Sequence, residues 1–319
     1  MLNRRYLRIQ AMQALYSFFS SSAEDGGDMP RGERELMRSI DKTYELYIYL
    51  LLIFEELVRV ASNRIDIGKE KHLPSAEELN PNLRFVNNRL IAQLTQHSKL
   101  RREADIRKLN WQQDDEMALV RNLWEQIKVW DVYRDYMTSE TDSYAKDQEF
   151  IADLFKKFIA DDEGTETFIE ERNMHWPGDL NMAVAPAIIR TLESGSETRE
   201  PALSPLFKDP EDDKQFIVDL FRKTIVDNQR CEKLIADKTK NWEVDRIAVM
   251  DVILMKMAIA ELLHFNSIPV KVTLNEYIEI SKTYSTPKSK QFINGILDKI
   301  VIDFKKDGTM QKTGRGLME

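Results

Sequence analysis

The sequence predicts an all-α protein. Only 11 glycines and 10 prolines occur in 319 residues, apolar residues recur at intervals of three and four over long segments, and no segment shows the apolar–polar alternation of a strand. Helices are predicted near residues 4–20, 33–66, 81–100, 114–138, 146–173, 180–193, 211–238, 243–265, 274–284 and 287–304. Segments at 20–32, 74–82 and 193–210, which carry Gly, Pro, Ser and Asn, separate several of them.

Composition limits the class of protein. A hydrophobic content of 42% is sufficient for a sizeable core. The single cysteine, Cys231, excludes an internal disulfide framework, and no apolar run follows the first arginines as in a signal peptide. The most apolar stretches, at 47–54 and 247–265, are too short or too interrupted by charge to span a bilayer. We therefore expect a cytoplasmic protein without a membrane segment.

Charge is unevenly distributed along the chain. Residues 1–22 and 266–319 each carry a net charge of +3. Because the whole chain carries −8, the region between them carries −14. Basic ends on an acidic middle suggest a localised site for an anion, although the overall charge argues against nucleic acid.

The predicted helix at 4–20 has an apolar face and a basic start. Its apolar residues fall on one face at about 100° per residue: Leu7, Ala11, Ala14, Leu15 and Phe18. Arg4 and Arg8 continue the same face, and Arg5 adds a third charge. If this helix packed fully, those guanidinium groups would be buried, so we expect the first turns to leave the body and meet an anionic partner. Positive charge there also opposes the helix dipole, a cost that such a partner would reverse. The alternative is a frayed basic terminus.

The predicted helix at 243–265 is apolar nearly all round, which indicates a central, buried element. Asp251 within it is either a buried, hydrogen-bonded carboxylate or an exposed acid. An internal repeat lies nearby, because residues 147–179 and 213–245 share thirteen identities in 33 ungapped positions. The two copies, which include Trp176 and Trp242, predict the same helix and the same turn into the next one, and repeated helical units favour one continuous helical body.

The last two helices have recognisable starts. Thr273 and Glu276 have the spacing of a capping box, and Thr286 followed by Pro287 fits an N-cap and first helical position. Gly295, inside the last helix, suggests close approach of another backbone.

Lys288, Ser289 and Lys290 occupy the first turn of that last helix. Free N–H groups, two lysines and a hydroxyl make a credible phosphate site. Phe292 and Tyr16 supply surfaces for base stacking, with core packing as the equal alternative for each.

No catalytic pattern is present. The four histidines, which lie far apart in sequence without metal-ligand spacing, are His72, His97, His175 and His264. Glycine-rich phosphate loops, a nucleophile elbow and a dinucleotide fingerprint are missing from the sequence. We expect no metal, no cofactor and no enzyme activity.

Two segments resemble the signatures of the NusB family: RRYLRIQAMQALYSF at 4–18 and IPVKVTLNEYIEISKTYSTPKSKQFINGILDKI at 268–300. The positions that match the family pattern are Gln13 to Tyr16, Glu261 to Leu263, Ile268 to Val272, Asn275 to Lys282 and Ser289 to Asp298. The resemblance covers residues 3–20 and about 213–303. Here NEYIEIS replaces the family's NEAIELA, and Lys288 replaces an acid commonly found before the serine.

The resemblance implies an all-helical protein that pairs with the ribosomal protein NusE. Together the two bind boxA RNA and promote transcription antitermination on ribosomal RNA operons, within the elongation complex. Carried over, it suggests phosphate contacts from Arg4, Arg5 and Arg8. The residues expected to line the RNA face are Gln13, Tyr16, Lys288, Ser289, Lys290 and Phe292. Tyr16, Asp251 and Glu261 are expected near the surface for NusE.

The chain is more than twice as long as typical members of that family and is similar to the extended forms of Bacteroidetes. We expect N-terminal core helices at 1–66, a helical insertion at 67–212, a C-terminal helical subdomain at 213–305 and a flexible tail at 306–319. A protein-binding scaffold without RNA contact is the alternative function. A NusB-like domain attached to an RNA methyltransferase is a third reading, for which the chain shows no second module.

Overall fold

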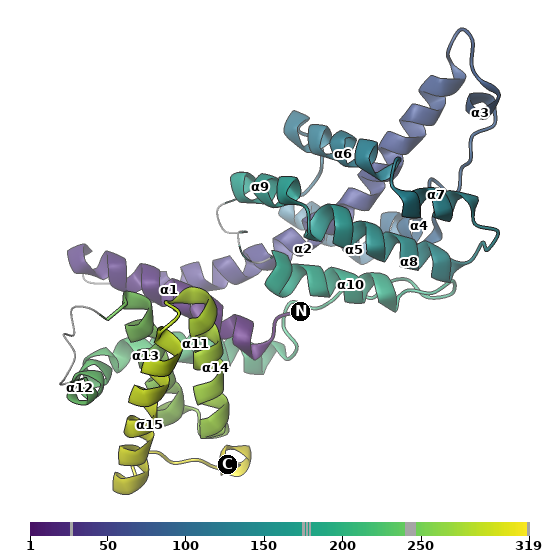
Figure 1. Ribbon diagram of the computed structural model, residues 1–319. Coiled ribbons are helices and arrows are strands. Elements are labelled where there is room, and N and C mark those ends of the chain that lie inside the picture. Colours follow the sequence, from purple (N-terminus) through teal and green to yellow (C-terminus); the bar gives the residue numbers. More distant parts are fainter. Residues whose placement is uncertain (26–27, 174–175, 177, 179, 240–246, 318–319) are drawn as a thin grey trace. The chain divides into compact units, whose positions relative to one another are not determined.

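The computed structural model describes residues 1–25, 28–173, 176, 178, 180–239 and 247–317. Figure 1 shows this part of the chain as helices joined by turns and loops, and no strand occurs within it. The predicted all-α fold class is confirmed. None of the helices described there is long and apolar enough to cross a membrane.

The helices follow one another closely along the chain. They are α1 Arg4–Asp25, α2 Met29–Lys69, α3 Ala76–Leu79, α4 Arg89–Gln96, α5 Ser98–Arg107, α6 Asp114–Ile127, α7 Asp131–Thr138, α8 Tyr144–Phe155, α9 Glu163–Arg172, α10 Ala185–Ser194, α11 Pro210–Val226, α12 Asn228–Lys238, α13 Val249–His264, α14 Val270–Tyr284 and α15 Ser289–Asp307, with π-helical turns at Lys156–Ala160 and Leu180–Val184 and a 3₁₀ turn at Gly314–Leu317. Several long predicted helices are each divided into two shorter ones. The helix predicted at 81–100 is divided at His97, which follows α4 and is the N-cap of α5, because its Nδ1 accepts the N–H of Leu100 (3.1 Å).

The chain forms two compact units. Unit 1 contains Met1 and residues 41–206, and unit 2 contains residues 2–40 and 207–319. These boundaries differ from the predicted ones at 66/67 and 212/213. The first boundary differs because α2 continues to Lys69 and buries most of its apolar side chains between Tyr44 and Ala61 in the core of unit 1.

Unit 1 is built around the second half of α2. Aromatic side chains fill much of its core. The rings of Tyr49 and Trp111 are stacked with centroids 4.3 Å apart, and the indole Nε1 of Trp111 donates to the backbone oxygen of Tyr49 (2.9 Å). This bond satisfies the polar atom of a fully buried indole, which burial requires.

Unit 2 is built around α13. This helix packs against α1, α11, α12, α14 and α15, which gather around it in Figure 1. Eleven of its sixteen residues are buried, as its apolar sequence predicts. Each fully buried Ile, Leu or Met side chain contributes about 1.5–3 kcal/mol, so α13 fixes the positions of the helices that cover it.

The two copies of the sequence repeat form matching helix pairs, α8 with α9 in unit 1 and α11 with α12 in unit 2. Asp147 and Asp213 stand at equivalent positions and are both buried. Each forms an ion pair with the first arginine of another helix. Arg89 Nε lies 2.8 Å from the carboxylate of Asp147, and Arg4 Nε lies 3.0 Å from that of Asp213. The match at Trp242 lies outside the described residues.

The starts of the last two helices differ from the prediction. α14 begins at Val270, so Thr273 lies inside its first turn and forms no capping box with Glu276. Its hydroxyl donates instead to the carboxylate of Glu261 (2.8 Å). α15 begins at Ser289, two residues later than Pro287, because residues 286–289 form a separate turn closed by the Ser289 N–H on the Thr286 carbonyl (2.9 Å).

Gly295 lies in open space. A Cβ added there would meet no atom within 4 Å, and the residue is exposed on α15. The expected close approach of another backbone is therefore wrong, and the glycine is not required by packing.

Candidate functional site

The centre of the predicted RNA-binding segment is a buried ion pair. Arg8 is 2% exposed and Glu261 is completely buried. Two parallel hydrogen bonds of 2.7 Å join them, from Nε and Nη2 of Arg8 to the two carboxylate oxygens. The carboxylate also accepts from Thr273 (2.8 Å) and from the Tyr277 hydroxyl (3.1 Å). Each oxygen thus has two donors, which is the condition for burying a charge.

This geometry corrects two predictions. An arginine that contacts phosphate must be exposed, and Arg8 is enclosed because the first turns of α1 pack against α11, α13 and α14 instead of leaving the body. Glu261 does not reach a partner surface either, since it neutralises Arg8 beneath α14. Although burial by itself lowers it, the pKa of Arg8 is raised by the charge of Glu261 and their hydrogen bonds.

Arg4 and Arg5 are partly exposed and also paired. Arg5 binds Glu276 of α14 through two hydrogen bonds of 2.9 Å, which raise the pKa of Arg5 and lower the pKa of Glu276. Arg4 pairs with Asp212 and Asp213 of α11, and its guanidinium lies 4.1 Å from the ring centroid of Phe216. The three arginines therefore connect α1 to three other helices of unit 2.

A cleft of about 730 Å³ adjoins these pairs. Its walls come from the start of α1, from α11, from the 265–269 loop and from α14. Arg4, Arg5 and Arg8 line it together with Asp212, Asp219 and Glu276. Because its acids offset its arginines, the cleft is not a strongly cationic site.

A second buried acid holds the start of α15. Asp251, on α13, is nearly fully buried and accepts hydrogen bonds from the hydroxyls of Ser285 and Ser289, the latter at 2.8 Å. Asp251 is thus the buried, hydrogen-bonded carboxylate of the two alternatives and is not a surface acid for a partner. Ser289 is 1% exposed, so its predicted phosphate contact is wrong as well, because its side chain serves as a donor to Asp251.

The two lysines beside Ser289 remain accessible. Lys288 and Lys290 are both exposed, and neither has an ion pair with another described residue. Phe292 follows one turn later and is half-buried. The anchored hydroxyl of Ser289 thus holds the turn in place while both flanking ammonium groups face solvent.

Gln13 and Tyr16 lie one turn apart on α1 and are both exposed, Tyr16 to 46%. Arg8 meets Glu261 near the end of α13, whereas Phe19, further along α1, lies over the ammonium of Lys256, 4.9 Å from the ring centroid.

The two basic ends of the chain, which suggested one localised anion site, meet α13 at different places. Asp251 and Glu261 are ten residues apart on α13, which is about 15 Å along a helix, so the arginine pairs and the lysine turn lie at different levels. Glu279 of α14 adds a negative charge near both, since its pKa is lowered by its hydrogen bond with Lys282 first and also by the charges of Arg5 and Lys290.

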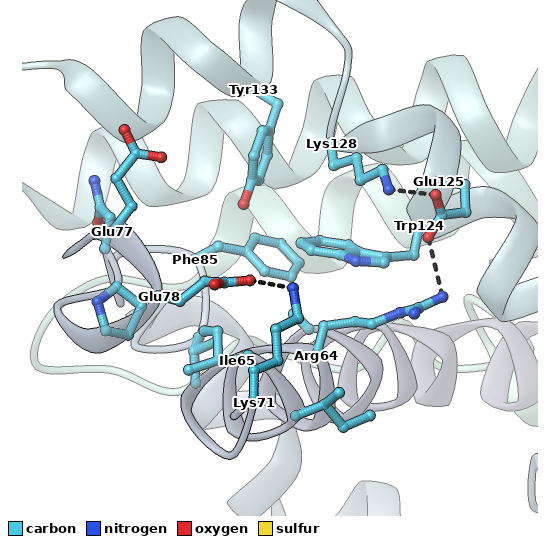
Figure 2. A pocket seen from close by; sticks show the side chains of 16 residues that line it. Arg64, Ile65, Lys71, Glu77, Glu78, Phe85, Trp124, Glu125, Lys128 and Tyr133 are labelled. Atoms are coloured by element: carbon cyan, nitrogen blue, oxygen red, sulfur yellow. Dashed lines mark hydrogen bonds and ion pairs between the residues drawn. The ribbon is translucent and has the colours of Figure 1, made fainter. Parts of the chain in front are cut away.

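Unit 1 has a separate cavity of about 400 Å³, shown in Figure 2. Phe85 and Trp124 form its floor with ring centroids 5.1 Å apart. Glu125 lies between Lys128 and Arg64, and Glu78 pairs with Lys71. Because every cation at its rim has a carboxylate partner, this cavity lacks the free positive charge that a phosphate requires. Nowhere in the described part of the chain do three His, Cys, Asp or Glu side chains converge as metal ligands.

The comparisons with known proteins identify the family. The sequence profile described as the NusB family matches residues 194–301. A transcription antitermination protein NusB of Salinibacter ruber is 40% identical over 138 residues, which are 41% of this chain and 86% of that protein. The chain belongs to the NusB family.

Two further NusB relatives are similar over shorter spans. The protein of Chloroherpeton thalassium is 44% identical over 106 residues, or 33% of this chain and 50% of that protein. The protein of Natranaerobius thermophilus is 35% identical over 92 residues, or 29% of this chain and 66% of that protein. No solved structure matches.

The NusB profile covers α11 to most of α15, with Asp251, Glu261 and the lysine turn inside it. Residues 1–193, which include α1, lie outside this match, as do the end of α15 and the tail after residue 301. Sequence reasoning missed Glu276, Tyr277 and Asp213 as partners of the arginines. The available signal was that residues 1–22 contain three arginines and no acid. Guanidinium groups that become buried or half-buried there require carboxylates from other helices.

Proposed function

We propose that this protein is an RNA-binding transcription antitermination factor that binds boxA-type RNA together with ribosomal protein NusE. Membership of the NusB family supports the general role. The proposed RNA site rests on two exposed lysines at the start of α15, which form no ion pair with a described residue, on a protein whose net charge is −8.

The lysine turn suits a phosphate. Lys288 and Lys290 flank the N-terminus of a helix, where free N–H groups and the dipole favour an anion. Gln13 and Tyr16 belong to the same proposed face, where an exposed tyrosine ring stacks on a base and an amide reads its edge. Phe292 adds half-buried aromatic surface.

The arginines have a different role in this proposal. Arg8 holds α1 on α13 and is not an RNA contact. Arg4 and Arg5 reach RNA only by leaving their acids, so they contribute less than the lysines. Tyr16 is the residue of the predicted NusE surface that is exposed, and Asp251 supports that surface from beneath by fixing Ser289.

The test is a titration of fluorescein-labelled boxA RNA and of a scrambled RNA of equal length, with and without NusE. We expect the complex with NusE to bind boxA more tightly than the scrambled RNA. Lys288→Glu/Lys290→Glu lowers the affinity at least tenfold, because reversing contact charges both removes attraction and adds repulsion. The matched control is Lys233→Glu/Lys299→Glu, two exposed lysines elsewhere in unit 2.

Equal binding of boxA and scrambled RNA by the complex overturns the proposed function and leaves the protein-binding scaffold as the better description. Equal losses in the two double variants overturn the assignment of the site while leaving RNA binding in place.

A further inference from the structure

A second cleft of unit 2 is lined by α14, α15 and the C-terminal tail. Its volume is about 730 Å³, and its walls include Leu274, Val301, Met310 and Leu317. Lys271 and Lys305 stand on the two helices, and Lys312 belongs to the tail. The tail residues lie outside the NusB profile match, which ends at residue 301, so this cleft includes structure that the family match does not account for.

The tail is held in place as one wall of the cleft. Gly308 takes a positive φ of 69° and ends α15, which lets the chain reverse. The N–H of Thr313 then donates to the backbone oxygen of Asn266 (3.0 Å), and the ammonium of Lys312 donates to the carbonyl of Phe265 (3.0 Å). The segment predicted as a flexible tail therefore packs against the loop that precedes α14.

Gly316 makes this packing possible. A Cβ at this position would lie 1.9 Å from the backbone oxygen of Asn266. Glycine is required here because of this lack of space and not because of its backbone conformation. Any larger residue must therefore move the tail away from the loop. The position offers a way to displace the wall without changing the charge of the cleft.

The charge of the cleft is one-sided. Lys271 and Lys305 are exposed and have no ion pair with a described residue. None of the described residues that line the cleft is acidic, and none is aromatic. Leu317 is 68% exposed at its rim. Aliphatic walls bearing free ammonium groups fit a ligand that presents carboxylates and bulky apolar groups together.

We propose that this cleft binds an acidic, amphipathic segment of another protein. The apolar side chains of the segment enter between α14 and the tail, and its carboxylates meet Lys271 and Lys305. Single-stranded nucleic acid fits less well because its bases bind through stacking on aromatic rings, which the described lining lacks. The inference does not depend on RNA binding at the lysine turn of α15.

The experiment uses the full-length protein and three fluorescein-labelled peptides of equal length, followed by fluorescence anisotropy. The first peptide is an amphipathic sequence of Glu and Leu, the second has Gln in place of every Glu, and the third has Lys there. We expect only the first to bind, with an affinity that falls as salt is raised. Lys271→Glu/Lys305→Glu weakens it at least tenfold, and Lys233→Glu/Lys299→Glu leaves it unchanged.

Gly316→Val supplies an independent variant. We expect it to weaken the Glu–Leu peptide by displacing the tail, while amide exchange of α13 stays as in the unchanged protein. The proposal is overturned if the Glu–Leu and Gln–Leu peptides bind equally, if no peptide binds, or if the two lysine double variants behave alike. It is also overturned if a uridine oligonucleotide binds more tightly than the acidic peptide and loses its binding on Lys271→Glu/Lys305→Glu.

Discussion

Arg8 is predicted to stabilise the fold and not to contact RNA. Replacing it by methionine keeps much of the side-chain volume and leaves the charge of Glu261 buried without its cation. Breaking a buried, hydrogen-bonded pair in this way costs about 3–5 kcal/mol. The carboxylate of Glu261 retains only Thr273 and Tyr277 as donors, which do not neutralise it. We therefore expect unit 2 to lose about 3–5 kcal/mol of its free energy of unfolding.

The assay is native-state hydrogen exchange of the α13 amides, because two compact units need not unfold in one transition. Arg5→Met is the matched control. Its pair with Glu276 is partly exposed, and such pairs contribute about 0–1 kcal/mol. Arg8→Met/Glu261→Gln removes both charges and should be more stable than Arg8→Met alone.

Two results would contradict this reasoning. The first is an Arg8→Met variant that loses no more stability than Arg5→Met. The second is an Arg8→Met variant of unchanged stability whose affinity for RNA falls sharply. That outcome would show that Arg8 leaves Glu261 to meet phosphate.

Three further predictions concern the same unit. The variant Lys288→Gln/Lys290→Gln should lower the slope of log affinity for single-stranded RNA against log salt by about 1.4, since each phosphate contact contributes about 0.7; an unchanged slope in a salt titration would remove both lysines from the interface. The pKa of Glu276 is lowered from its ordinary 4.5 by its hydrogen bond with Arg5. The pair therefore stabilises the fold above pH 4.5, and this stabilisation is lost as the pH falls through the lowered pKa. Glu276→Gln should flatten the acid side of the curve of stability against pH, and parallel curves measured by urea denaturation would refute the pairing. Gly295→Ala should raise the stability by up to about 1 kcal/mol, because the added methyl group meets nothing, and a lower melting temperature would show a contact that the structure lacks.

Local pattern was enough to predict most of the fold. The apolar faces of α1 and α13 are buried as their periodicity indicates, and the repeat forms corresponding helix pairs. The starts of α14 and α15 were mispredicted because tertiary contacts overrode capping chemistry. Thr273 and Thr286 are good N-terminal residues by type, but neither caps its helix. The Thr273 hydroxyl donates to the buried carboxylate of Glu261, and the Thr286 hydroxyl lies 2.8 Å from that of Ser289, which donates to Asp251.

The candidate site was harder to predict because charge alone does not reveal its partner. Lys288 and Lys290 lie at the start of α15, within two residues of the predicted helix start, and both are exposed, since a helix start and its flanking residues are local features. Whether Arg8 faces solvent depended on Glu261, which lies 253 positions away in the sequence. No spacing rule within α1 contains that information.

The repeat extends further in three dimensions than in sequence. Asn88 caps α4 by accepting the N–H of Ile91 (3.0 Å), and Asn3 likewise accepts the N–H of Tyr6 (2.8 Å) at the start of α1. The residue after each asparagine is the arginine that pairs with Asp147 or Asp213. Both units thus use an Asn–Arg helix start held by a buried aspartate of the repeated helix, although the 33-residue match includes neither asparagine.

The charges at the start of α1 are tolerated because each arginine has its own acid from a different helix. Positive charge in a first turn costs about 0.3–1 kcal/mol against the dipole. Leaving either Arg8 or Glu261 buried without its partner would cost more than that, so their pairing holds α1 on α13 despite the dipole. The same arrangement removes these arginines from the free cationic surface. In the proposed function, the two exposed lysines at the start of α15, which form no ion pair with a described residue, carry the electrostatic attraction for RNA instead. This division of roles fits the proposed RNA-binding face on a protein whose net charge is −8.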